Sequence, residues 1–238
     1  MSDRTITESA KAIAYKLAQK YIDKDPEENI PNLLDLLEKF DFGGQITRQV
    51  RTIRSSIQDK GNNWRKLLFS LWADVDDGVR IKLFENFVVS ASMLGSPRQQ
   101  QLSRKEGCNV PWAILMDPTS ACNLKCAGCW ASEYGTSMNL SLEELDSIIT
   151  QGKEMGTYFY IFSGGEPMVR KDDIIRLCEK HPDCAFMAFT NGTLFSESFA
   201  NEMLRVKNFV PALSVEGFRK ATDSRRGEGT YDKVISTM

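Results

Sequence analysis

Residues 113–129 read AILMDPTSACNLKCAGC, and this stretch decides the fold. Its first four residues, 113–116, are apolar and predict a short buried strand. Three cysteines, Cys122, Cys126 and Cys129, follow on the loop after that strand. Thiolates are the usual ligands of iron–sulfur clusters, and most 4Fe–4S clusters use four of them. Three closely spaced cysteines on one loop can therefore hold three irons of a cubane and leave the fourth iron open to another ligand.

Strands and helices alternate on the C-terminal side of the cysteine loop. Further strands are predicted at 158–162, 185–189 and 209–213. Helices are predicted at 141–155, 172–180 and 196–206, and another begins at Thr230. Alternating β and α units imply parallel strands with crossover helices. The sequence therefore predicts an α/β core, a partial parallel (β/α) barrel whose cysteine loop lies at the C-terminal end of the first strand, where barrel active sites are found.

The first part of the chain has apolar residues at helical spacing and predicts about five helices. Turns are predicted at Asp25-Pro26, Gly43-Gly44, Gly61-Asn62-Asn63 and Asp76-Asp77-Gly78. The run Gly95-Ser96-Pro97 is expected to end the last helix, and residues 99–107 to form a polar linker. We therefore expect an all-α domain at 1–97, a linker at 98–111 and the α/β core at 112–238.

The core is short for a complete barrel. Eight βα units take about 250 residues, or roughly 30 per unit, and residues 112–238 number 127, enough for about four units. Four parallel strands without closing partners leave an unpaired edge. The sequence is thus expected to be a truncated or split form of a longer protein, completed by a missing C-terminal half or by oligomerisation.

Charge and composition limit the class of protein. The chain has 30 Lys and Arg against 32 Asp and Glu, and this balance gives no field that would favour nucleic acid. No apolar run approaches the roughly 18 residues of a membrane span, and the N-terminus has no apolar signal core. A cytoplasmic protein is predicted. Six cysteines in such a chain suggest metal or redox chemistry before disulfides.

The C-x3-C-x2-C spacing after a strand resembles the radical S-adenosylmethionine (radical SAM) superfamily. In that family the open iron binds S-adenosylmethionine, the reduced cluster cleaves it, and a 5′-deoxyadenosyl radical abstracts hydrogen from the substrate. The resemblance implies a 4Fe–4S cluster, S-adenosylmethionine and a reductant such as flavodoxin or ferredoxin. Gly128 departs from the pattern, since the residue before the third cysteine is usually aromatic; here Trp130 follows that cysteine.

Three more strand ends carry segments that resemble the family's motifs. The run Gly164-Gly165-Glu166-Pro167 is similar to the motif for the methionine amino group, and paired glycines let backbone approach a ligand closely. Thr190-Asn191-Gly192 ends the third strand, as in many members. Ser214-Val215-Glu216-Gly217 ends the fourth and, with Asp223 and Arg226, resembles a segment whose serine and arginine contact S-adenosylmethionine. The resemblance implies that the cofactor-binding residues are Gly164, Gly165, Glu166, Pro167, Thr190, Asn191, Ser214, Glu216 and Arg226.

Alternatives remain open at this point. A structural zinc knuckle would need a fourth ligand from Cys108, Cys178, Cys184 or His181. Cys178 and Cys184 flank a turn at the opposite end of the strands and are expected to be core or surface thiols. The rival function is a non-catalytic metal-binding or scaffold protein. The last segment looks most like the subgroup with extra clusters C-terminal to the barrel, and the substrate, a peptide or a small molecule, cannot be read from the sequence.

Overall fold

The computed structural model describes residues 3–39 and 47–238, in two compact units that comprise residues 1–81 and 82–238. Each unit is considered by itself. The predicted Gly43-Gly44 turn lies outside the described residues. No described helix is long and apolar enough to cross a membrane.

The first unit is helical. Its helices are α1 (Asp3–Lys24), α2 (Pro26–Lys39), α3 (Thr47–Gln58), α4 (Asn63–Ala73) and the start of α5 (Asp77–Leu83). Its buried apolar residues are Ile30 and Leu34 of α2 and Val50 and Ile57 of α3. Each pair is separated by about one or two helical turns, so each helix presents one apolar face to the other.

A partly buried polar contact also holds this unit together. Asp23 Oδ1 accepts hydrogen bonds from Trp72 Nε1 at 2.9 Å and from Arg80 Nη2 at 3.2 Å. The Arg80 guanidinium also lies over the Trp72 ring, 5.3 Å from its centre. One carboxylate thereby joins α1, α4 and α5, because a cation and an indole N–H share a single acceptor.

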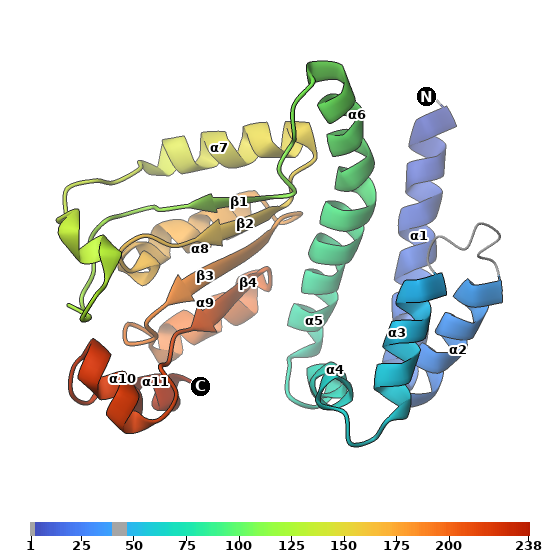
Figure 1. The fold of residues 1–238 in the computed structure, drawn as a ribbon. Helices are drawn as coiled ribbons and strands as arrows, with labels where there is room; N and C mark the ends of the chain where they lie inside the picture. Colours follow the sequence, from blue (N-terminus) through green and yellow to red (C-terminus); the bar gives the residue numbers. More distant parts are fainter. Residues whose placement is uncertain (1–2, 40–46) are drawn as a thin grey trace. The chain divides into compact units, whose positions relative to one another are not determined.

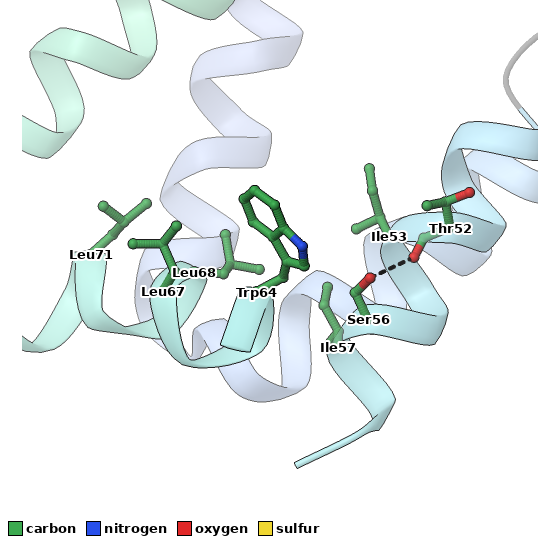
Figure 2. A pocket seen from close by; sticks show the side chains of 8 residues that line it. All are labelled: Thr52, Ile53, Ser56, Ile57, Trp64, Leu67, Leu68 and Leu71. Atoms are coloured by element: carbon green, nitrogen blue, oxygen red, sulfur yellow. Dashed lines mark hydrogen bonds between the residues drawn. The ribbon is translucent and has the colours of Figure 1, made fainter. Parts of the chain in front are cut away.

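A hollow of about 370 Å³ lies between α3 and α4 (Figure 2). Its lining is apolar apart from Thr52 and Ser56, and Trp64 at its rim is 71% exposed. The Ser56 hydroxyl donates to the Thr52 carbonyl and so turns its polar atom back to the helix. The hollow is therefore an apolar groove on the surface of the helical unit.

The second unit is built on four parallel strands in the order β1-β2-β3-β4 (Figure 1). Their bounds are β1 (Ala113–Met116), β2 (Phe159–Phe162), β3 (Ala185–Thr190) and β4 (Phe209–Leu213). The register pairs Leu115 with Ile161, Ile161 with Met187, and Met187 with Val210. The strands form an open parallel sheet of the kind expected of a partial (β/α) barrel, which confirms the predicted α/β class, with β1 and β4 as the two edges.

Three helices pack on one face of this sheet: α7 (Leu142–Met155), α8 (Lys171–Lys180) and α9 (Glu197–Val206) (Figure 1). Alternate strand residues point to this face. Tyr160, Phe162 and Phe186 are among them, all 1% exposed or less. The Phe162 and Phe186 rings stack with centroids 5.9 Å apart, and the Tyr160 hydroxyl lies 2.9 Å from the Ile149 and Thr157 carbonyl oxygens. This layer is the core of the unit.

The remaining short elements lie near the strand ends. They are η2 (Trp130–Glu133), η3 (Pro167–Arg170), α10 (Arg219–Arg226) and α11 (Thr230–Thr237). Helix α7 begins as its sequence predicts, with a complete capping box between Ser141 and Glu144. Helix α10 was not predicted, because its sequence, RKATDSRR, has no apolar stripe.

The predicted stop at Gly95-Ser96-Pro97 and the polar linker at 99–107 are wrong. A π-helix, η1 (Phe84–Gly95), runs directly into α6 (Ser96–Glu106). Pro97 lies in the first turn of α6, at the point where the π-helix gives way to the α-helix. Gly95 is present for close packing, because a Cβ there would stand 2.2 Å from the Gly156 carbonyl oxygen. The buried Gln99 side chain donates to that same oxygen at 2.7 Å, so the helix is fastened to the end of α7.

Candidate functional site

The cysteine loop leaves the C-terminal end of β1 on a fixed base. Ser120 N donates to the Met138 carbonyl at 2.8 Å, and Leu140 N donates to the Pro118 carbonyl at 3.2 Å. These bonds bring the two arms of the loop, on either side of the cysteines, back together. The loop is thus closed at its base, as a ligand-holding loop above a sheet must be if its side chains are to keep their positions.

The glycine pair after β2 lies against this base. Gly165 N donates to the Thr119 carbonyl at 2.9 Å, and Glu166 N donates to the Ala121 carbonyl at 2.8 Å. A Cβ on Gly165 would stand 2.3 Å from the Ala121 oxygen, and Gly164 has φ +101°. The space beside Gly165 is therefore filled by the cysteine loop's own backbone, ending one residue before Cys122. On this side, the paired glycines allow the backbone of the cysteine loop to approach their own backbone closely.

Glu166 is a buried residue, 1% exposed, that connects the C-terminal ends of β2 and β3. Its carboxylate accepts hydrogen bonds from Thr190 Oγ1 at 2.6 Å, Asn191 N at 2.7 Å and Met168 N at 3.0 Å. Burial raises the pKa of this carboxyl, and the three donors oppose that rise. Pro167, also buried, starts η3 directly after it. The end of β3, through Thr190 and Asn191, is thus bound to the Glu166 carboxylate.

The β3 end also reaches into the cysteine loop. Asn191 Nδ2 donates to Asn123 Oδ1 at 2.9 Å, and Asn123 Nδ2 donates to Thr193 Oγ1 at 2.7 Å. The Thr193 hydroxyl and amide donate to Asn191 Oδ1 at 2.7 and 2.9 Å. Asn123 lies between the first two cysteines, so the three side chains close a ring of hydrogen bonds beside Cys122.

The segment after β4 contacts the loop from another side. Ala127 N donates to the Arg225 carbonyl at 2.7 Å, at the C-terminal end of α10. Glu216 accepts from Arg226 Nη2 at 2.7 Å and from Arg225 Nη1 at 2.8 Å, and these hydrogen bonds lower the pKa of its carboxyl. Ser214 N donates to the Thr190 carbonyl at 2.9 Å and extends the β3–β4 pairing. Glu216 and Arg226 are therefore paired with each other.

The electrostatics of the three thiols fit a cationic group. Cys122 is exposed, and Cys126 and Cys129 are half-buried. Burial raises the pKa of the Cys122 and Cys126 thiols; Glu166, Cys126 and Cys129 raise the pKa of Cys122 further, and Cys129 raises that of Cys126. Arg226 and Arg225 oppose this at Cys126. Three thiolates at this spot would repel one another, so a positively charged iron centre is the kind of ligand that would stabilise them.

The other cysteines lie elsewhere. Cys178 and Cys184 are buried in the core, as predicted, and Cys108 is exposed. His181 caps α8, and its Nε2 lies 2.8 Å from Asp146 Oδ1. Among the described residues, no group of three or more His, Cys, Asp or Glu side chains converges closely enough to hold a single metal ion. A cubane differs in that each thiolate meets a separate iron.

Residues 116–238, just over half of the chain, match the family described as the radical SAM superfamily. The chain belongs to the radical SAM superfamily. The family match begins at the last residue of β1 and includes the cysteine loop and all the strand-end segments described above.

Curated relatives share the same part of the chain. A Fe-coproporphyrin III synthase of Methanosarcina barkeri (strain Fusaro / DSM 804) is 30% identical over 126 residues, which are 51% of this chain and 32% of the relative. A GTP 3′,8-cyclase of Shewanella denitrificans (strain OS217 / ATCC BAA-1090 / DSM 15013) is 30% identical over 156 residues, 61% of this chain and 45% of the relative. The chain thus spans less than half the length of either relative.

A solved structure supports the fold. Streptococcus suis SuiB bound to S-adenosylmethionine superposes with a TM-score of 0.51 and 17% identity, over 79% of this chain and 42% of SuiB. At that identity the likeness concerns the fold alone.

Sequence reasoning missed three of the residues that organise this end of the sheet: Asn123, Thr193 and Arg225. Asn123 stands inside the cysteine motif, so its position was a usable signal. Thr193 lies just after the strand-end motif at 190–192 and carries no motif of its own. Arg225 acts through its backbone carbonyl, which no side-chain pattern reveals.

Proposed function

We propose that the chain is a radical SAM enzyme that binds a 4Fe–4S cluster through Cys122, Cys126 and Cys129 and cleaves S-adenosylmethionine reductively. When bound, the cluster supplies the electron for that cleavage, and the resulting 5′-deoxyadenosyl radical abstracts hydrogen from a substrate. The observation that carries the proposal is the meeting of three thiols on one loop with the ends of three further parallel strands. Active sites of such barrels lie at this end.

The chain's own residues would prepare the site in two ways. The backbone bonds from Gly165 and Glu166 to the loop fix the arm that leads to Cys122. The bond from Ala127 to Arg225 fixes the stretch between Cys126 and Cys129. A preorganised loop needs little reordering when the cluster is inserted.

S-Adenosylmethionine would lie against the strand ends. The backbone of Gly164 to Pro167 faces the methionine end in this proposal, with the Glu166 carboxylate shaping that segment through Thr190 and Asn191. Ser214 and Arg226 are the candidates for its carboxylate or ribose. Because Arg226 already pairs with Glu216, the guanidinium arrives oriented, and an incoming carboxylate would share it.

The reductant and the substrate belong to the proposal as classes only. A flavodoxin- or ferredoxin-like protein would supply the electron, and the substrate is a peptide or a small molecule. Further cluster-binding segments, a completed barrel and a cytoplasmic location are likewise proposals.

The experiment is anaerobic reconstitution of the 238-residue chain with iron and sulfide, followed by reduction in the presence of S-adenosylmethionine. A brown protein with about four irons per chain that releases 5′-deoxyadenosine is expected. The rival reading is a structural metal-binding or scaffold protein. A colourless product that retains one zinc and leaves S-adenosylmethionine intact would establish that rival.

A further inference from the structure

Asn123 is the second residue of the cysteine motif, and its amide is engaged at both ends. Its Oδ1 accepts from Asn191 Nδ2 at 2.9 Å, and its Nδ2 donates to Thr193 Oγ1 at 2.7 Å. Both partners follow β3, about 70 positions further along the chain. An exposed loop side chain that makes two such long-range bonds holds its loop in one place.

The same hydrogen bonds continue to the glycine segment after β2. Asn191 N donates to Glu166 Oε2 at 2.7 Å, and Thr190 Oγ1 donates to Glu166 Oε1 at 2.6 Å. Glu166 is buried, so these bonds are shielded from water. An unbroken path therefore runs from Asn123 through Asn191 to Glu166, and it joins the stretch between two cysteines to the segment proposed to hold the methionine end.

The position of Asn123 also complements the backbone anchors. The bonds from Gly165 and Glu166 fix the loop as far as Ala121, and the bond to Arg225 fixes it again at Ala127. Asn123 anchors the stretch between them, which carries the first two cysteines. Without it, that stretch would keep its thiols and lose its side-chain tie to β3.

We propose that Asn123 is a positioning residue that sets the geometry between the cluster loop and the S-adenosylmethionine segment, acting through Asn191. The inference rests on the proposed function and adds a residue to it. Its consequence is specific: loss of the amide leaves cluster loading intact and weakens the response of the cluster to S-adenosylmethionine. Residues that orient metal ligands from outside the ligand set typically change affinity or activity by about 10- to 100-fold.

The test compares three variants of the full chain, each reconstituted anaerobically. Asn123→Ala removes both hydrogen bonds. Asn123→Asp keeps the acceptor for Asn191 Nδ2, and the Thr193 hydroxyl can turn from Asn191 Oδ1 to the second carboxylate oxygen, while the Thr193 amide stays on Asn191 Oδ1. Asn201→Ala makes the same chemical change on an exposed position of α9, away from the site, and serves as the matched control.

Three measurements separate positioning from folding: iron per chain, the melting temperature, and the electron paramagnetic resonance spectrum of the reduced cluster during titration with S-adenosylmethionine. For Asn123→Ala we expect wild-type iron and melting temperature, with the spectral change shifted to about tenfold higher S-adenosylmethionine. Asn123→Asp should recover most of that affinity, and Asn201→Ala should match the wild type throughout.

A double variant tests the route. If Asn123 acts through Asn191, Asn123→Ala should add little to the effect of Asn191→Ala. A wild-type titration curve for Asn123→Ala, or fully additive effects in the double variant, would overturn the proposal. Loss of iron together with a lowered melting temperature in Asn123→Ala would also overturn it, in favour of a purely structural role. Failure of the wild type to form a cluster would instead refute the proposed function.

Discussion

The two ends of the four-stranded sheet use the same residue types for opposite purposes. At the C-terminal end, Cys122 is exposed, and the side chains of Asn123 and Asn191 bind each other. At the N-terminal end, Cys178 and Cys184 are buried, and nearby asparagines bind backbone.

At the N-terminal end, buried amide groups donate to backbone carbonyls, while Asn208 Oδ1 and His181 Nδ1 are buried without a hydrogen-bond partner among the described residues. Asn208, with no exposed surface, has its Nδ2 within 3.0–3.2 Å of the carbonyl oxygens of Cys178, His181 and Cys184. Asn86 of η1 donates to the Cys184 carbonyl at 2.7 Å. The two side-chain amides donate hydrogen bonds to the carbonyls of this turn, which the surrounding thiols and aromatic rings could not do. The amide nitrogens then have little capacity left to bind a ligand.

The comparison teaches that residue type does not distinguish a site from a core here. What differs is the partner. A cysteine or amide whose neighbours are backbone carbonyls and rings supports the fold, and one whose neighbours are side chains on other strand ends remains able to meet a ligand. The same type of substitution, made at each of the two ends, should therefore give different outcomes.

The largest difference is expected from the thiols. Cys126→Ala should abolish stable 4Fe–4S binding, because two thiolates cannot hold three irons. Cys178→Ala should keep the cluster and lose only roughly 1 kcal/mol of stability from a small cavity. Iron and sulfide analysis after reconstitution checks both. Unchanged iron in Cys126→Ala would mean that the ligand assignment is wrong.

The next effect concerns two glycines in tight contacts. Gly165→Val would drive a side chain into the Ala121 carbonyl, so we expect a displaced cysteine loop, with cluster loading reduced along with S-adenosylmethionine binding. Gly95→Ala would collide with the Gly156 carbonyl and should lower stability by about 1–3 kcal/mol. Iron content per folded chain should stay normal in Gly95→Ala and fall in Gly165→Val. Equal iron in both would contradict the structure.

Asn208→Ala should be costly for the fold and silent for the site. It removes the Asn208 donor from the buried Cys178 carbonyl, at about 1–3 kcal/mol for a group left unsatisfied. The His181 carbonyl keeps Cys184 N, and the Cys184 carbonyl keeps Asn86 Nδ2. Urea unfolding should show a loss of about 1–3 kcal/mol, with the spectrum of the reduced cluster unaltered in the protein that folds. A changed spectrum at full stability would show that the two ends are coupled.

The smallest effect is a pH dependence next to the N-terminal end. Asp146 accepts from Lys180 and His181, and although burial raises the pKa of its carboxyl, these hydrogen bonds outweigh burial and lower it. A lowered folded-state pKa means stability that is present above the unfolded value of about 3.9 and lost as the pH falls through the folded value.

Asp146→Asn should therefore be less stable than the wild type by roughly 1 kcal/mol at neutral pH. The difference should shrink as the pH falls below about 4. Chemical unfolding at several pH values measures it. A stability difference that stayed constant down to acid pH would assign the effect to packing.

Local signals predicted most of the α/β unit. The strands at 113–116 and 209–213 were placed to the residue, because short apolar runs ended at clear turns, and Ser141 with Glu144 marked the start of α7. The helix end at Gly95 failed for a physical reason. Glycine and proline signal a stop only when nothing packs against them, and the contact between Gly95 and Gly156 joins residues that the sequence leaves far apart.

The site was predictable in its ligands and only partly in its architecture. The spacing of the cysteines and the strand-end motifs identified what gathers at one end of the sheet. That Glu166 would be enclosed by Thr190 and Asn191, or that Asn123 would bind across to β3, depends on the register between strands. Side-chain patterns do not encode that register directly, because it emerges only when neighbouring strands are paired.

The strand order has a consequence for how the chain assembles. Because β1 to β4 pair in the order of synthesis, each strand can dock on its predecessor as it emerges. The separations between paired residues are unequal: Ile114 meets Tyr160 after 46 positions, Phe159 meets Ala185 after 26, and Phe186 meets Phe209 after 23. The first connection carries the cysteines, and its near-doubled length costs about 0.6 kcal/mol more in closure entropy. The β1–β2 pairing thus carries the largest closure cost of the three, and the loop that bears the thiols is the segment that must be closed.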